Sequence, residues 1–107
     1  MTRGDSQDTG RQRRDLAAQA INQATAQDWQ AAIVTNQRLI AASGRDIEAH
    51  NRLGKAYAQL GRRAEAHAAY AATLALDPTT TIAQRHVARL AARQDESVSE
   101  QGFTPPV

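Results

Sequence analysis

Residues 47–80 read IEAHNRLGKAYAQLGRRAEAHAAYAATLALDPTT, and this stretch decides the fold of the chain. Its first half carries an L-G-x-x-Y pattern at Leu53, Gly54 and Tyr57. Leu53, Tyr57 and Leu60 recur at helical spacing and predict an apolar stripe on a helix that runs from about residue 47 to residue 60. Gly54 lies on this stripe although glycine costs about 1 kcal/mol relative to alanine inside a helix. We therefore expect a second helix to approach Gly54 too closely for a Cβ atom.

That second helix is expected to follow at once, over residues 63–76. Gly61 is placed to end the first helix, and Pro78 cannot continue the second because proline has no backbone N–H. Asp46 is a suitable N-cap for the first helix. The face of the second helix that packs on the first is expected to consist of Ala66, Ala69, Tyr70, Thr73 and Leu74.

The stretch resembles a tetratricopeptide repeat, a helix-turn-helix unit of about 34 residues. The resemblance is carried by the L-G-x-x-Y pattern, by A-x-x-x-Y at Ala66 and Tyr70, and by the closing Asp77-Pro78. His50 stands where the family has a leading tryptophan. The resemblance implies an all-α fold, a right-handed α-α superhelix of antiparallel helix hairpins, and a binding scaffold with no enzymatic activity.

A degenerate copy of the repeat precedes it, in residues 13–46. Ala32 and Leu39 lie one repeat length before Ala66 and Thr73, and helices are expected at about residues 12–26 and 29–42. The copy has polar residues where the family is apolar or aromatic, at Gln19, Gln23 and Asn36. Because a buried polar group without a partner costs roughly 1–3 kcal/mol, we expect Asn36 to be hydrogen-bonded or close to solvent.

A lone capping helix is predicted after the complete repeat, in residues 80–94, where it would cover the last open apolar face. The expected domain of five helices thus spans residues 12–94. Residues 1–11 and 95–107 are polar and rich in turn-forming residues, and we expect both to be disordered tails. Two repeats and a cap lie near the lower size limit for an independent core, so a homodimer is one way to bury the remaining apolar surface.

Composition excludes several other classes of protein. The hydrophobic fraction of 41% is largely alanine, which suits thin helix packing and no large sheet core. The chain has no cysteine, so it has no disulfide frame and no thiolate metal site. No apolar run is long enough to span a membrane and no secretory signal is apparent, so we expect a soluble, cytoplasmic protein.

No catalytic constellation appears in the sequence. It has no G-x-S-x-G motif, no glycine-rich phosphate loop and no pair of carboxylates at a spacing typical of acid–base catalysis. The histidines lack the spacing of zinc ligands; His50 is expected to pack in the core, and His67 and His86 to lie on the surface. Trp29, Tyr57 and Tyr70 are expected in the core. We therefore predict no enzyme, no metal and no cofactor.

Charge is distributed unevenly, although the net charge is only +2. The predicted folded part beyond residue 47 is basic, whereas the tail that follows carries Asp95, Glu96 and Glu100 and no base. In the family, the first helix of each repeat lines a concave groove. Carried onto this chain, the groove positions are Asn51, Lys55 and Gln59 in the complete repeat, Arg85, Arg89 and Arg93 in the capping helix, and Ala17, Ile21 and Thr25 in the degenerate repeat.

This groove has an apolar wall at Ile21 and a strongly basic wall opposite. In the family, a clamp of Asn, Lys and Arg grips the terminal carboxylate and acidic side chains of peptide tails, and Asn51, Lys55 and Arg89 are of those types. The leading hypothesis is a protein-protein interaction module that binds an acidic peptide segment of a partner, with the acidic tail covering the groove when no partner is present.

Three other interpretations stay open. The basic residues can be an ordinary solvated helix face, or the chain can be a homo-oligomerising scaffold. The third is a basic helical domain that associates with nucleic acid through Arg62, Arg63, Arg85, Arg89 and Arg93.

Overall fold

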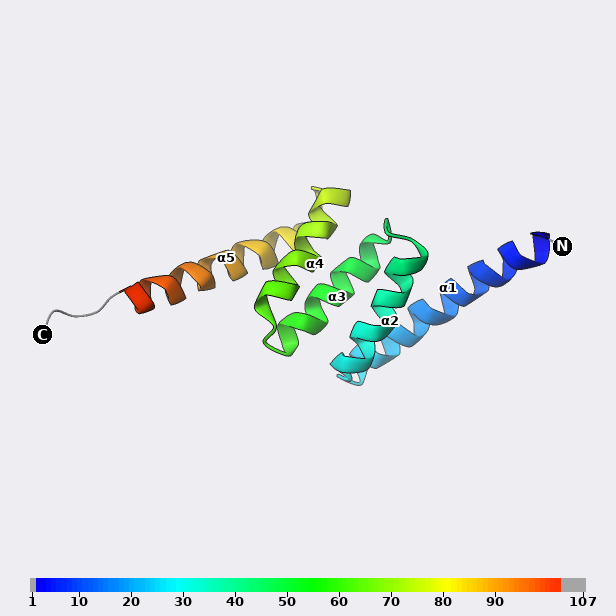
Figure 1. Ribbon diagram of the computed structural model, residues 1–107, viewed down its shortest axis with the longest axis horizontal. Helices are drawn as coiled ribbons and strands as arrows, with labels where there is room; N and C mark the ends of the chain where they lie inside the picture. Colours follow the sequence, from blue (N-terminus) through cyan, green and yellow to red (C-terminus); the bar gives the residue numbers. More distant parts are fainter. Residues whose placement is uncertain (1, 103–107) are drawn as a thin grey trace, which may run out of the picture.

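The computed structural model describes the backbone of residues 2–102 and the side-chain surroundings of residues 10–90 and 92. Five α-helices follow one another, and the described backbone contains no strand (Figure 1). They are α1 (Thr2–Thr25), α2 (Trp29–Ala42), α3 (Ile47–Gln59), α4 (Arg63–Leu76) and α5 (Thr81–Gly102). The all-α fold with five helices is therefore confirmed. None of the described helices combines the length and the apolar character that a membrane span requires.

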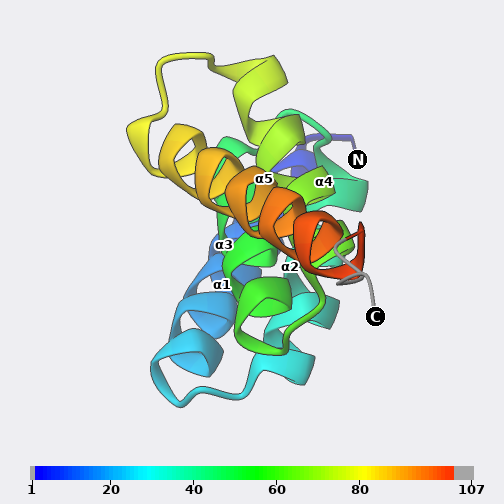
Figure 2. The same cartoon turned by 90° about the vertical axis from the view of Figure 1, so that its left-hand side faces the viewer.

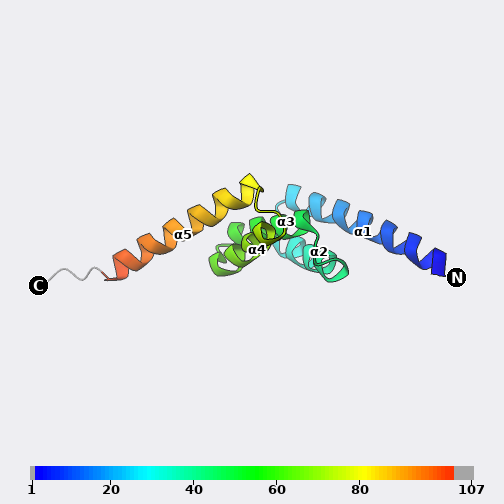
Figure 3. The same ribbon diagram turned by 90° about the horizontal axis from the view of Figure 1, so that it is seen from above.

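The helices stack in chain order. Each packs on the next, and α1 also contacts α3. Seen from above, α1 and α5 lie on one side of the molecule and α2 and α4 on the other, with α3 between them (Figure 3). The free ends of α1 and α5 project beyond the central helices in opposite directions (Figure 1). In the view along the long axis of the molecule, α2, α3 and α4 lie behind α5 (Figure 2). This arrangement leaves α3 accessible from the side of α5.

Local signals set the bounds of the three central helices. The Asp46 carboxylate accepts a hydrogen bond of 3.0 Å from the Ala49 N–H, which confirms Asp46 as the N-cap of α3. Asp28 caps α2 in the same way, with a bond of 3.3 Å from the Ala31 N–H. Helix α4 ends before Pro78, as expected.

Gly61 ends α3 in a left-handed conformation, with φ at +76°. An alanine Cβ would meet no atom within 4 Å there, so the cost of Gly61→Ala is conformational, about 1 kcal/mol. Gly44 also has open space around it but no positive φ, which makes Gly44→Ala a matched control. Urea denaturation should show Gly61→Ala destabilised and Gly44→Ala unchanged or slightly stabilised. Equal stabilities of the two variants would contradict this account.

The core is thin and built largely from alanine and aromatic side chains. Tyr57 and Tyr70 are buried together with Ile33, Leu53 and several alanines, and Trp29 packs against this cluster while remaining partly exposed. Leu60, which we expected on the buried stripe, is 37% exposed. It is the C-cap residue of α3, where the chain already turns away from the helix, so its side chain leaves the stripe.

Gly54 lies at a close helix contact, as predicted, and its partner is the Tyr70 ring on α4. A Cβ atom on Gly54 would lie only 2.8 Å from Tyr70 Cζ. The glycine therefore lets the ring of α4 lie directly on the backbone of α3.

The polar position Asn36 is completely buried and satisfied. Its Nδ2 donates to the Ala32 carbonyl oxygen at 2.8 Å, and its Oδ1 accepts from Arg52 Nε at 3.0 Å. The expectation that Asn36 is hydrogen-bonded is confirmed. The bond from Arg52 also ties α3 to α2.

The outer helices are longer than expected. Helix α1 begins at Thr2 and not near residue 12, and α5 continues to Gly102 and does not end near residue 93. Neither extension contains proline, and each residue added to an existing helix gains a backbone hydrogen bond. The backbone that carries Asp95, Glu96 and Glu100 therefore runs away from the central helices (Figure 1). We had expected the acidic segment to cover the groove, but along this path α5 does not bring it back over α3. Residues 103–107 lie outside the described part.

Candidate binding groove

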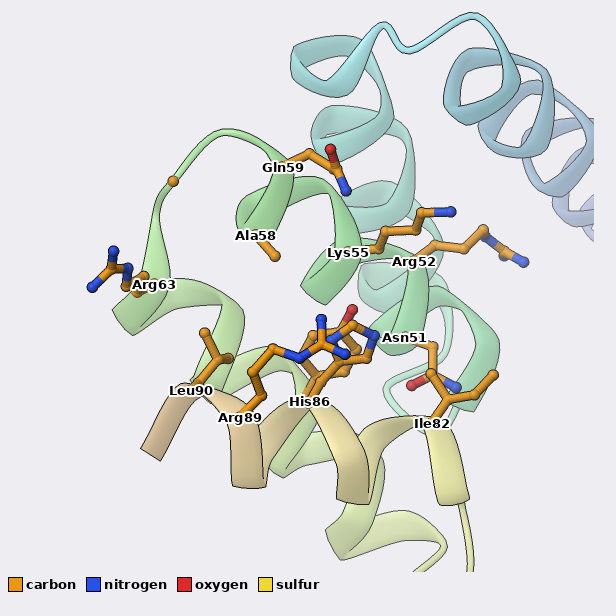
Figure 4. Close-up of a pocket in the computed structure, with 12 residues that line it drawn as sticks. Asn51, Arg52, Lys55, Ala58, Gln59, Arg63, Ile82, His86, Arg89 and Leu90 are labelled. Carbon is orange, nitrogen blue, oxygen red and sulfur yellow. The ribbon is translucent and has the colours of Figure 1, made fainter. Parts of the chain in front are cut away.

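A cavity of about 620 Å³ lies between α3 and α5, with α4 beneath it. Figure 4 shows side chains from α3 on one side and from α5 on the other. The α3 side consists of Asn51, Arg52, Lys55, Ala58 and Gln59, and the α5 side of Ile82, His86, Arg89 and Leu90. Gly61, Arg63 and Tyr70 complete the lining. The part of the predicted groove that α3 and α5 contribute thus lies at a concavity.

The structure brings together some of the predicted site residues but not all of them. Those that line the cavity are Asn51, Lys55, Gln59 and Arg89. Arg85 is exposed on α5 outside the lining, and the side chain of Arg93 lies outside the described residues.

The predicted apolar wall is in a different place. Ile21 is 51% exposed on α1 and does not line the cavity. Helix α1 packs on α2 and α3, and none of its residues lines the cavity. Apolar surface comes instead from Ile82, which is 55% exposed, and from Leu90 and Ala58.

The lining is cationic. It contains Arg52, Lys55, Arg63 and Arg89, and no Asp or Glu among the described residues that form it. Arg52 pairs with Glu48 at 3.7 Å, whereas the other three form no ion pair within the described part of the chain. Several cations around one partly enclosed space raise the local positive potential and attract anions, although Arg52 and Lys55 direct their charged ends toward α2 (Figure 4). No group of three or more His, Asp or Glu side chains in the described chain is placed to hold a metal ion.

Lys55 stands at the edge between the cavity and α2. Its Nζ lies 5.9 Å from the centre of the Trp29 ring, within the range of a cation–π interaction. This contact orients the ammonium group without neutralising it. Trp29 therefore supports the site from outside, a role that the sequence did not reveal.

His86 is a site residue that the sequence analysis placed wrongly. It was expected on the surface, but its ring lies in the cavity and stacks on Tyr70, with ring centres 4.5 Å apart and planes 1° from parallel. The signal was its spacing, because Ile82, His86 and Arg89 recur on one face of α5. Partial burial lowers the pKa of His86, and the nearby Arg89, Arg85 and Lys55 lower it further.

Asn51 presents an unused hydrogen-bonding group. Its Oδ1 is buried and has no partner among the described residues. A buried acceptor without a partner is costly, so a rotation that exposes this oxygen to an N–H donor of a ligand would be favoured. The amide group can also donate through its Nδ2, which suits a ligand with both donors and acceptors.

Comparison with known protein families matches one segment, α3 and α4 with the turns that flank them. Residues 47–80 correspond to the family described as tetratricopeptide repeat. Residues 47–80 are a tetratricopeptide repeat. Such repeats generally mediate protein–protein interaction. A search of curated proteins finds none that matches the chain.

The tetratricopeptide repeat supplies one wall of the cavity through α3 and its floor through Tyr70 of α4. The other wall belongs to α5, which the family match does not cover. The assignments of residues 13–46 as a degenerate repeat and of residues 80–94 as a capping helix stay predictions.

Proposed function

We propose that this protein binds an acidic peptide segment of a partner protein in the cavity between α3 and α5. The observation that carries the proposal is the lining itself, in which cations stand beside apolar side chains and no carboxylate is found among the described residues. A segment with several carboxylates and at least one apolar side chain complements both parts of this surface.

Lys55 and Arg89 are the principal anion-binding groups in this proposal. They come from opposite walls, so a carboxylate between them would contact both helices. The guanidinium group of Arg89 can hold a carboxylate through two parallel hydrogen bonds. Ile82 and Leu90 would take the apolar side chain of the segment.

Asn51 favours a peptide over a nucleic acid. A peptide backbone offers N–H donors to its unpaired Oδ1, whereas a phosphodiester backbone has none. Two of the residues in the nucleic-acid hypothesis are also poorly placed, since Arg62 is paired with Glu65 at 2.6 Å and Arg85 lies outside the lining.

The proposal is tested with the variant Lys55→Ala/Arg89→Ala. We expect it to lower the affinity for a labelled, N-acetylated glutamate–leucine peptide by at least about tenfold, because two charge-assisted contacts are lost. Fluorescence anisotropy measures the affinity. The melting temperature should change little, because both side chains are exposed and form no ion pair with described residues, and the exposed Lys55–Trp29 contact contributes only about 0.5–1 kcal/mol.

The matched control is Arg38→Ala/Arg45→Ala. It removes the same charge from exposed positions outside the cavity and should bind the peptide like the parent chain. An equal loss in both double variants would mean that the peptide responds only to overall charge, and the cavity would not be the site. Tight binding of a homopolymeric oligonucleotide, with a steep loss on adding salt, would favour the nucleic-acid alternative.

A further inference from the structure

His86 occupies a position where its own charge depends on what fills the cavity. The groups that face it come from three helices: Lys55 from α3, Tyr70 from α4, and Arg85 and Arg89 from α5. None of them is an acid that is ionised at neutral pH, because burial raises the pKa of Tyr70 to about 12. In the empty cavity, protonating the imidazole would therefore place a further cation among cations.

We propose that His86 takes up a proton when an acidic peptide segment enters the cavity, so that its imidazolium becomes one of the groups that hold the ligand. This inference rests on the proposed function. A carboxylate between Lys55 and Arg89 offsets their charge at His86 and provides an acceptor for an imidazolium N–H. The Tyr70 ring already holds the imidazole in one plane, so little further ordering is needed.

The direction of the pH dependence follows from proton linkage. In the empty chain the pKa of His86 lies below its ordinary value, owing first to burial and then to the neighbouring cations. A bound carboxylate raises it, so the complex binds more protons than the free chain. Affinity then rises as the pH falls through the pKa of His86 in the complex, and it levels off below the pKa of His86 in the empty chain. The total rise in affinity is about tenfold for each pKa unit between these two values. At still lower pH the carboxylates of the peptide become protonated and affinity falls again.

Isothermal titration calorimetry with the glutamate–leucine peptide, in two buffers of different ionisation enthalpy, counts the protons taken up. We expect net uptake by the parent chain near neutral pH, and an affinity that increases by up to about tenfold between about pH 8 and pH 5.5. His86→Phe keeps an aromatic ring on Tyr70 but cannot titrate, so its affinity should be nearly flat over this range. His67→Gln removes another histidine, outside the cavity lining, and should keep the parent's pH dependence.

Each outcome bears on a different claim. If the peptide binds without proton uptake, or if His86→Phe keeps the full pH dependence, the inference is wrong while the proposed function stands. If the peptide does not bind at any pH, the proposed function fails and the inference fails with it. Should His86→Phe not fold, the NMR titration of the His86 imidazole in the parent chain decides: its pKa must rise when peptide is added, and an unchanged pKa overturns the inference.

Discussion

Gly54→Leu is expected to lower the free energy of unfolding by about 3 kcal/mol or more, because a side chain is forced into a filled contact. The ideal Cβ position on Gly54 lies 2.8–2.9 Å from three ring carbons of Tyr70. Real Cβ atoms essentially never lie this close to another side chain. Tyr70 is 1% exposed, and its ring is held between α3 and the imidazole of His86, so it cannot shift without displacing His86. Urea denaturation followed by circular dichroism measures the change.

A smaller substitution separates the steric cost from helix propensity. Gly54→Ala should also destabilise the protein, although alanine by itself favours a helix interior by about 1 kcal/mol over glycine. Adding Tyr70→Leu should recover part of the loss, because the ring carbons that clash are gone. Adding Tyr70→Phe should recover none, because phenylalanine keeps those carbons. An unfolding curve of Gly54→Leu that matches the parent would show that α4 does not press on Gly54.

Asn36→Ala is expected to cost about 3 kcal/mol of stability. The substitution removes a fully buried side chain and both of its hydrogen bonds, and it leaves Arg52 Nε without its acceptor between α2 and α3. The measurement is again the free energy of unfolding in urea.

A double-mutant cycle identifies the contact that matters. Asn36→Ala and Arg52→Ala should be non-additive, with a coupling of roughly 1 kcal/mol, because the two residues share one partly buried hydrogen bond. Glu48→Ala is the control: it removes the other partner of Arg52, but that carboxylate side chain is 84% exposed and the pair should contribute less than about 1 kcal/mol. Additive effects of Asn36→Ala and Arg52→Ala would contradict the role given to this bond.

Local chemistry was sufficient to predict the central helices. Caps and stops act within a few residues, so Asp46 and Pro78 mark the ends of α3 and α4 whatever the rest of the chain does. Gly61 adopts the positive φ that its place after Leu60 suggested. The close approach at Gly54 was also predictable, since a glycine on the apolar stripe of a helix weakens that helix unless a neighbouring element packs against its backbone. The outer ends of α1 and α5 were not predictable, because those stretches contain no residue that must stop a helix.

Residue patterns alone predicted the three central helices, the hairpin of residues 47–80 and the basic character of the groove. Helical spacing identified the faces that carry Asn51, Lys55 and Arg89, and these residues do meet at one cavity. Only the tertiary structure decided that Ile82 and not Ile21 supplies apolar surface there, and that His86 stacks on Tyr70 inside it. The physical reason is that spacing along a helix gives the direction of a side chain but not the distance to the next helix. That distance depends on how α5 crosses α4, which is settled by tertiary packing such as the stacking of His86 on Tyr70.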